Sequence, residues 1–313
     1  MRRSIVAARG FVAALALVLL LPTVGSAADP VATGLSYLKV GVGARSVALG
    51  NAVVSHVDDA SAMGWNPGAL PLLRGTNAEL MHQESLDGVR HEYAALAHAA
   101  GVGGSARLGG GISFQGVWTN PIKKYDLSGQ YEGEFGYSDI GLSMGYGFSP
   151  IERVGVGAAV EYLREAIDTF TATGVAWNFG VQAREILPRT DAGFAVLHLG
   201  SDMKFEAQAF RLPLTLQGGL SHVVPLSSLG GTVRLAVEMR KVRDEGLCGL
   251  VGTEYEYQHA ARVQIGYRSG QDSESVSFGM GVGKGRIRGQ YSFVPFRNNL
   301  GDQHRIAVQM ALG

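Results

Sequence analysis

Hydrophobic and polar residues alternate along most of this chain, the pattern of β-strands whose two faces meet different surroundings. In residues 139–148, one side carries large apolar residues from Ile140 to Phe148, whereas the other carries Asp139, Ser143 and three glycines. Residues 174–184, 232–240, 275–283 and 304–312 repeat the alternation. A helix is a poor alternative, because each interior glycine costs a helix about 1 kcal/mol and the apolar positions miss the 3.6-residue period.

The alternating segments number about fourteen, within a range of roughly twelve to sixteen. They are residues 77–84, 91–99, 105–117, 135–148, 153–164, 174–184, 191–199, 211–224, 231–240, 250–258, 261–268, 275–283, 285–294 and 304–312. Many are about ten residues long, as tilted membrane strands are, and long joins such as 165–173 alternate with tight turns such as 149–152. We therefore predict an all-β fold, a transmembrane antiparallel β-barrel spanning residues 77–313, with both chain ends on the periplasmic side.

The first 28 residues have the order of a secretory signal peptide. Arg2, Arg3 and Arg9 precede an apolar run from Phe11 to Leu21, and small residues follow up to Ala28. The run of eleven apolar residues is too short to cross a bilayer as a helix, which takes about 20. We predict cleavage of residues 1–28 and export to the outer membrane of a Gram-negative type of cell, where membrane lipid surrounds the barrel.

Composition narrows the function classes. Among 313 residues, 27 are basic and 27 are acidic, so the surplus of positive charge typical of a nucleic-acid binder is missing. Glycine contributes 45 residues, roughly twice the ordinary usage. Because Cys248 is the single cysteine, a disulfide framework and a cysteine-based zinc site are both excluded.

Residues 29–76 lack strand periodicity, and we predict that they form a hatch inside the barrel. Residues 58–63 suggest a capped helical turn, which the Asn66-Pro67 pair then ends. A lumen of fourteen strands is wide enough to need filling. We expect Trp65 to pack against the barrel wall and Asn66 to hydrogen-bond nearby backbone. The gating candidates of this segment are Arg45, Asp58, Asp59, Trp65, Asn66 and Pro67.

Two stretches near the amino terminus resemble the PorV/PorQ family, which is similar to the FadL-type long-chain fatty-acid transporters. They are residues 38–45 (LKVGVGAR) and residues 58–68, which contain Asp58-Asp59-Ala60-Ser61 and Trp65-Asn66-Pro67-Gly68. Residues 294–296 and 301–306 also look like the family's last hairpin. Gly68 departs from the alanine usual in the family, and the chain ends without the aromatic residue that often closes such barrels. The resemblance implies a fourteen-strand outer-membrane barrel with an amino-terminal hatch and no enzyme activity.

Catalytic chemistry is not visible in the sequence. His56, Asp58, Asp59 and Ser61 supply the residue types of a hydrolytic triad, but within six residues they cannot easily converge as base, orienting group and nucleophile. We expect no catalytic residue, no metal and no cofactor. Charged residues lie opposite the apolar face, where we expect a salt-bridged lumen or a docking surface for the hatch, with a selectivity filter for a charged solute as the alternative. These lumen candidates are Arg234, Glu238, Arg240, Glu254, Arg262, Arg268, Arg288 and Arg305.

Two functions remain open on this basis. The PorV-like reading, which we favour from the sequence, is a non-enzymatic accessory of type IX-like protein secretion that handles exported cargo. Apolar residues of the longest loop, such as Ile122, Tyr125 and Leu127, favour binding of an exported protein. The alternative is a FadL-like channel for uptake of hydrophobic small molecules. The sequence identifies neither the solute nor the cargo, and it indicates no oligomeric state.

Overall fold

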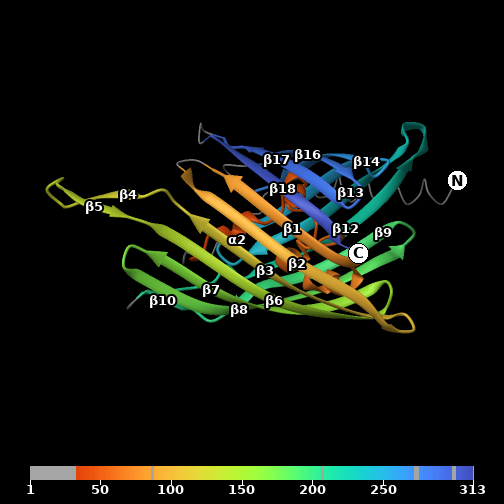
Figure 1. Cartoon of the computed structure of the whole chain (residues 1–313), viewed down its shortest axis with the longest axis horizontal. Coiled ribbons are helices and arrows are strands. Elements are labelled where there is room, and N and C mark those ends of the chain that lie inside the picture. Colours follow the sequence, from red (N-terminus) through yellow and green to blue (C-terminus); the bar gives the residue numbers. More distant parts are fainter. Residues whose placement is uncertain (1–32, 86–87, 206–207, 271–274, 298–300, 313) are drawn as a thin grey trace.

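The main feature of the protein, described here by a computed structural model, is a closed antiparallel β-barrel of fourteen strands (Figure 1). The structure describes residues 33–85, 88–205, 208–270, 275–297 and 301–312. Neighbouring barrel strands follow one another along the chain, and β1 closes the ring on β18. The barrel strands are β1 (Gly75–Glu84), β2 (Arg90–Gly103), β3 (Ala106–Trp118), β6 (Tyr137–Ile151), β7 (Val154–Ile167), β8 (Phe170–Leu187), β9 (Thr190–Gly200), β12 (Thr215–Leu226), β13 (Gly231–Val242), β14 (Leu247–Tyr257), β15 (Ala261–Arg268), β16 (Val276–Lys284), β17 (Ile287–Pro295) and β18 (Asp302–Leu312). The predicted all-β barrel of fourteen strands is confirmed.

The two faces of the strands differ as the alternation predicts. On β6, the outward side chains Leu142, Met144, Tyr146 and Phe148 are 42% to 64% exposed, whereas the inward Asp139 is fully buried. The large exposed residues of the other barrel strands face outward in the same way. An apolar outer surface is what lipid contact requires, because a charge facing lipid costs about 2–4 kcal/mol at the midplane.

Most connections at one end of the barrel are short, and several at the other end are long. The short end has two-residue turns at 104–105, 152–153, 188–189 and 285–286, and it also holds the start of β1 and the end of β18. At the long end, the β3–β6 connection contains a hairpin of β4 (Ile122–Tyr125) and β5 (Tyr131–Phe135), which projects beyond the barrel (Figure 1). At the same end, the β9–β12 connection contains β10 (Met203–Phe205) and β11 (Gln208–Phe210). At the short end, a 3-10 turn, η3 (Ser227–Leu229), joins β12 to β13.

The predicted long join over residues 165–173 is wrong. β7 extends to Ile167 and β8 begins at Phe170, so that only two residues connect the two strands. Ala172 is buried on the inward face, and Asp168 takes a φ of 52°, the left-handed conformation that two-residue hairpin turns favour. The alternation is hard to recognise here because the inward residues of β8, Ala172 and Gly174, are small and the turn carries no glycine.

Residues 33–74, which we call the inner segment, run through the interior of the barrel (Figure 1). The segment contains α2 (Tyr37–Val40), α3 (Ala44–Ala48), α4 (Ala62–Trp65) and the 3-10 helix η1 (Pro67–Leu72). The helix α3 packs on β15 to β18, while η1 packs on the opposite wall formed by β2, β3 and β6 to β8. The segment thus crosses the lumen from wall to wall. No helix in the described part of the chain is long and apolar enough to cross a membrane.

The principal hydrophobic core lies between the inner segment and the wall. Leu49, Val54, Met63 and Leu70 are each at most 1% exposed, and the wall meets them largely with alanines and glycines. Small wall residues let the backbones approach closely. A Cβ on Gly109 would lie 2.3 Å from the carbonyl oxygen of Leu70, and a Cβ on Gly157 would lie 2.1 Å from that of Pro67. The glycine excess is therefore used where the wall touches the inner segment.

Some sequence predictions concern residues outside this description. The signal peptide over residues 1–28 lies outside the described residues and stays a prediction, as does the start of the hatch at residue 29. The helical turn expected over residues 58–63 begins only at Ala62. It ends at Trp65, directly before the Asn66-Pro67 pair.

Candidate functional site: the lumen of the barrel

The Asn66-Pro67 pair fastens the inner segment to β8. The Asn66 side-chain amide donates to the carbonyl oxygens of Val54, at 2.8 Å, and of Val181 on β8, at 3.0 Å. Its carbonyl oxygen accepts from the backbone N–H of Gly68 at 3.0 Å, which closes the turn at the start of η1. One fully buried side chain therefore joins two parts of the inner segment to the wall.

Trp65 is buried in the core cluster that the inner segment shares with wall residues such as Ala195 and Leu197. Its indole N–H donates to the carbonyl oxygen of Val42 at 2.9 Å, and its ring lies over Gly41, where a Cβ would be 2.7 Å from it. Both partners belong to the inner segment rather than to the wall. The ring also lines the central pocket described below.

Arg45 is the centre of an ionic cluster that reaches from α3 to β14. Its guanidinium makes two hydrogen bonds to the Glu254 carboxylate, at 2.7 and 2.8 Å, and one to Asp58 at 2.8 Å. Arg45 is 3% exposed and Glu254 is also buried, so water screens their attraction little. Burial alone would raise the pKa of Asp58, but Arg45 and the nearby Arg262 and Arg234 hold it below its usual range. The cluster keeps its carboxylates charged inside the lumen.

Asp59 lies at the edge of the same cluster, 3.8 Å from the Arg45 guanidinium. Its carboxylate accepts from Ser61 within the segment and from the side-chain amide of Gln309 on β18, at 2.9 Å. Burial and the neighbouring Asp58 charge raise the pKa of Asp59. Near this residue, the Glu79 carboxylate on β1 is fully buried.

Glu238 of β13 holds the backbone of the inner segment directly. Its carboxylate accepts from the N–H groups of Val54, at 3.1 Å, and Ser55, at 2.9 Å, and from the Ser55 hydroxyl at 2.7 Å. Gln217 on β12 supports it by donating to the same carboxylate and to the carbonyl oxygen of Asn51, both at 2.7 Å. Glu238 therefore fixes this part of the inner segment through hydrogen bonds rather than through an ion pair.

The other lumen candidates lie on the inward face but do not form one site. Arg234 contacts Asp191 at 3.1 Å, and Arg262 contacts Glu256 at 3.1 Å. Arg240 donates to the carbonyl oxygen of Lys39 at 2.9 Å, and Arg305 donates to Gln83 at 2.5 Å. Arg268 is buried on β15, and Arg288 lies near Glu256 and donates to the carbonyl oxygen of His259. Mixed pairs of this kind are spread around the wall.

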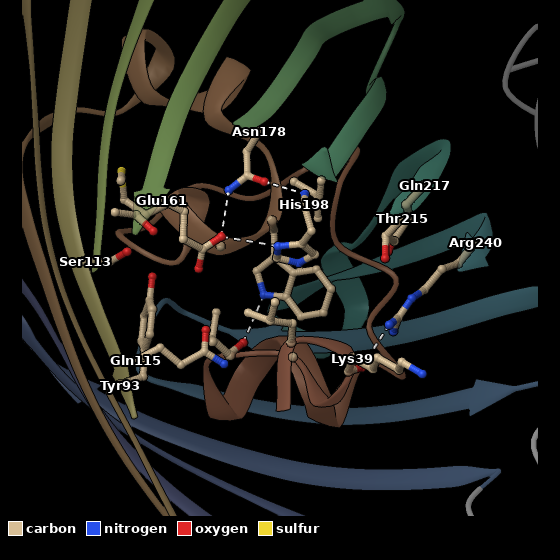
Figure 2. Close-up of a pocket in the computed structure, with 18 residues that line it drawn as sticks. Lys39, Tyr93, Ser113, Gln115, Glu161, Asn178, His198, Thr215, Gln217 and Arg240 are labelled. Atoms are coloured by element: carbon tan, nitrogen blue, oxygen red, sulfur yellow. Dashed lines mark hydrogen bonds and ion pairs between the residues drawn. The ribbon is translucent and has the colours of Figure 1, made fainter. Parts of the chain in front are cut away.

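A narrow central pocket lies beside Trp65 (Figure 2). It has room for about two water molecules. Apolar side chains of the inner segment, such as Leu38 and Val42, border it on one side, and polar side chains of the wall border it on the other. The polar wall residues are Tyr93, Ser113, Gln115, Ser143, Glu161, Asn178, His198, Thr215, Gln217 and Arg240.

A β-bulge between β8 and β9 brings His198 into this pocket. The register shifts between Trp177 and Phe179, so that two residues of β9 oppose Asn178. His198 takes a φ of 59°, a strained conformation for this residue type. The Asn178 carbonyl oxygen accepts the His198 backbone N–H at 2.7 Å, and the imidazole Nδ1 lies 3.2 Å from the Glu161 carboxylate (Figure 2). Sequence reasoning missed this set, because only the bulge makes His198 inward.

The side chains of the hypothetical triad are used for structure instead. Ser61 contacts Asp59, while Asp58 contacts Arg45. Burial, Arg234 and Arg45 lower the pKa of His56, whose ring contacts Ser55 at 3.3 Å. Across the described residues, no three His, Cys, Asp or Glu side chains are placed to hold one metal ion. The arrangement packs the inner segment against the wall and bonds it there through buried polar side chains.

Comparison with solved structures relates this architecture to known proteins. The toluene transporter TbuX of Ralstonia pickettii superimposes with a TM-score of 0.60 at 15% identity, covering 87% of this chain and 99% of that one. The toluene transporter TodX of Pseudomonas putida gives 0.54 at 13% identity, covering 86% and 96%. A FadL homologue of Pseudomonas aeruginosa gives 0.52 at 10% identity, covering 90% and 98%. The chain shares its fold with these proteins.

The sequence itself has no comparable match. No family model matches the chain, and no curated protein matches it. The resemblance to PorV/PorQ therefore stays a prediction, whereas the FadL-like architecture rests on the superposition over nearly the whole chain.

Proposed function

We propose that this protein is an outer-membrane channel for small hydrophobic molecules, in which the inner segment is the gate. The observation that carries the proposal is a barrel of the same fold as two toluene transporters, with a lumen occupied by a segment held through hydrogen bonds. The apolar outer face supports a place in the membrane, and the predicted signal peptide supports export across the inner membrane.

The size of the central pocket explains why a gate is needed. A pocket with room for about two water molecules cannot pass an aromatic ring. A wider polar cavity lies at the short-turn end, next to His56, Arg74 and Arg184, and the inner segment separates it from the long-loop end. A solute that enters from outside must therefore displace part of the inner segment.

A disulfide between the inner segment and the wall tests this gating. A Cβ on Gly252 of β14 would lie 3.1 Å from the Cβ of Leu49, close to the spacing of about 3.5–4.5 Å in disulfides. We would combine Leu49→Cys and Gly252→Cys in a Cys248→Ser background. Oxidation should lower the uptake of radiolabelled toluene by cells at least tenfold, and reduction should restore it.

The single variant Gly252→Cys in the same background is the matched control and should show no response to oxidant. If the oxidised pair and the reduced pair take up toluene at equal rates, with the cross-link verified by mass spectrometry, the gating proposal fails. If neither form exceeds cells without the protein, the channel proposal itself fails.

The secretion accessory is kept as a second candidate because of one exposed feature. The β4–β5 hairpin carries Ile122, Tyr125, Leu127 and Tyr131, which are 40% or more exposed beyond the end of the barrel. Replacing residues 120–136 with a short turn should leave toluene uptake unchanged if the protein is a channel. Loss of a co-purifying secreted protein in that variant would support the accessory role.

A further inference from the structure

The wall formed by β6 and β7 carries three acidic side chains, none of which pairs with a lysine or an arginine in the described part of the chain. Asp139 and Glu165 are direct cross-strand partners on the inward face, and Glu161 lies four residues along β7 on the same face. Glu161 contacts the His198 imidazole, and Asp139 accepts from the Tyr137 hydroxyl at 2.6 Å.

This acidic wall differs from the ionic clusters on β14 and β15. Glu254 has Arg45 as its partner, and Glu256 has Arg262. Asp139 and Glu165 each accept one hydrogen bond, from the Tyr137 hydroxyl and from the Leu35 backbone N–H, but one oxygen of each carboxyl group is buried without a hydrogen-bond partner. A carboxylate oxygen left without a hydrogen bond is costly unless a proton or a cation binds to it.

An independent observation comes from Tyr37 of the inner segment. Its side chain is 4% exposed, and its hydroxyl has no hydrogen-bond partner. The hydroxyl lies 2.8 Å from the place that a Cβ on Gly141 would take, and a Glu161 oxygen lies 3.0 Å from the same place. Tyr37 therefore points into the acidic wall, within about 6 Å of Glu161, and Asp139 and Glu165 also act on it electrostatically.

Apolar side chains surround the same position. Leu35, Leu163, Met203 and Leu212 are each at most 1% exposed and form one cluster with Tyr37. Trp65 and Glu161 both line the central pocket, and an aromatic ring attracts a cation over its face. The pocket has room for a group of the size of an ammonium, although Lys39 and Arg240 line it as well.

Resting on the channel function proposed above, we infer that this wall selects solutes that combine an apolar body with one organic ammonium group. The ammonium would lie between Asp139, Glu165 and the Tyr37 hydroxyl on the way to Glu161, and the apolar body would replace contacts of the Leu35 cluster. A metal ion fits less well, because no three ligands among the described residues are placed around one point.

Binding of three matched probes tests the inference. Benzylamine, benzyl alcohol and toluene share one ring and differ in charge and hydrogen bonding. We would measure their binding to the detergent-solubilised mature protein at neutral pH by isothermal titration calorimetry. Benzylamine should bind at least tenfold more tightly than benzyl alcohol, because only the ammonium neutralises the acidic wall.

Two variants locate the effect. Asp139→Asn combined with Glu165→Gln keeps the shape of the wall and removes its charge, so the preference for benzylamine should fall to within about twofold. Glu132→Gln, in the exposed β4–β5 hairpin, is the matched control and should keep the full preference. Heat-modifiable migration on gels verifies that each variant is folded.

Equal affinities for benzylamine and benzyl alcohol, or an unchanged preference in the folded double variant, would overturn the inference. Competition by calcium chloride that is lost in the double variant, without any benzylamine binding, would also overturn it in favour of a metal site. Because binding in detergent does not require passage through the barrel, these outcomes are separate from the toluene uptake that tests the channel.

Discussion

At the residue scale, the single side chain of Asn66 joins the inner segment to the wall. Replacement by alanine leaves the carbonyl oxygens of Val54 and Val181 and the N–H of Gly68 without their partner. Each buried group left unpaired costs about 1–3 kcal/mol. We expect Asn66→Ala to lower the free energy of unfolding, measured by guanidinium titration in liposomes. Asn77→Ala should have little effect, because the side-chain amide of Asn77 makes one exposed hydrogen bond, to the carbonyl oxygen of Arg74.

Arg45 offers a sharper test of the ionic cluster. Arg45→Met leaves Glu254 buried and unpaired, a change that costs about 3–5 kcal/mol in comparable buried pairs. The double variant Arg45→Met with Glu254→Gln removes both charges and should recover most of this loss in the same titration. If the double variant is no more stable than Arg45→Met alone, the pair does not act as a unit.

The start of the inner segment should respond to acid. Asp244, in the β13–β14 connection, accepts from the backbone and hydroxyl of Thr33 and from Lys39 at 2.7 Å. Burial would raise the pKa of Asp244, but these hydrogen bonds hold it below its usual range. A lowered pKa means that the stabilisation is present above the unfolded value of about 3.9 and is lost as the pH falls through the folded value.

Limited digestion checks this behaviour. Pepsin should cut near residues 33–40 in the wild type at pH 2 but not at pH 4, whereas Asp244→Asn should be cut at both. Cleavage of the wild type that does not change between the two values would show that Asp244 does not hold this end.

At the scale of the element, the two faces of a strand differ in what they tolerate. Leu80 of β1 points outward and is 54% exposed, whereas Asn77 of the same strand borders the polar cavity at the short-turn end. Leu80→Arg should hinder insertion into liposomes by about 2–4 kcal/mol if it lies near the midplane, and Asn77→Arg should be nearly neutral. Equal losses would contradict the assigned register.

The filled lumen limits which inward positions accept a long side chain. A water-filled channel would tolerate arginine at Ser143 or Ser277 better than arginine on the outer face. Ser277 is 1% exposed and donates to the carbonyl oxygen of Ala48, and Ser143 borders the central pocket. Neither position has room for a long side chain, so Asn77 is the better inward position for comparison.

At the scale of the whole molecule, the sequence predicts the wall better than what the wall holds. Strict alternation around Leu142 or Phe278 identifies strands and their faces, because large apolar residues occupy one face and small or polar residues the other. The bulge at His198 and the turn at Asp168 depend on positive φ values at residues that are not glycine, so the sequence gives no sign of them. The pairing of Arg45 with Glu254 joins residues 209 positions apart, and nothing local in the sequence specifies it.

The sequence also pointed to the segment that matters most. Residues 38–45 and 58–68, singled out by their motifs, contain the Arg45 cluster and the Asn66 anchor. The acidic wall cannot be recognised in the sequence, because Asp139, Glu161 and Glu165 belong to two different strands and become neighbours only through the β6–β7 register.

Closure of the lumen by the inner segment is the central claim, and single-channel conductance in planar bilayers tests it most directly. A variant lacking residues 33–70 but retaining the signal region should still form the barrel, because its strands supply their own hydrogen-bond ladder. Circular dichroism and heat-modifiable migration would verify the fold. We predict that the variant conducts small ions at least tenfold better than the parent protein. Equal conductance of a folded truncated barrel and its parent would contradict the account.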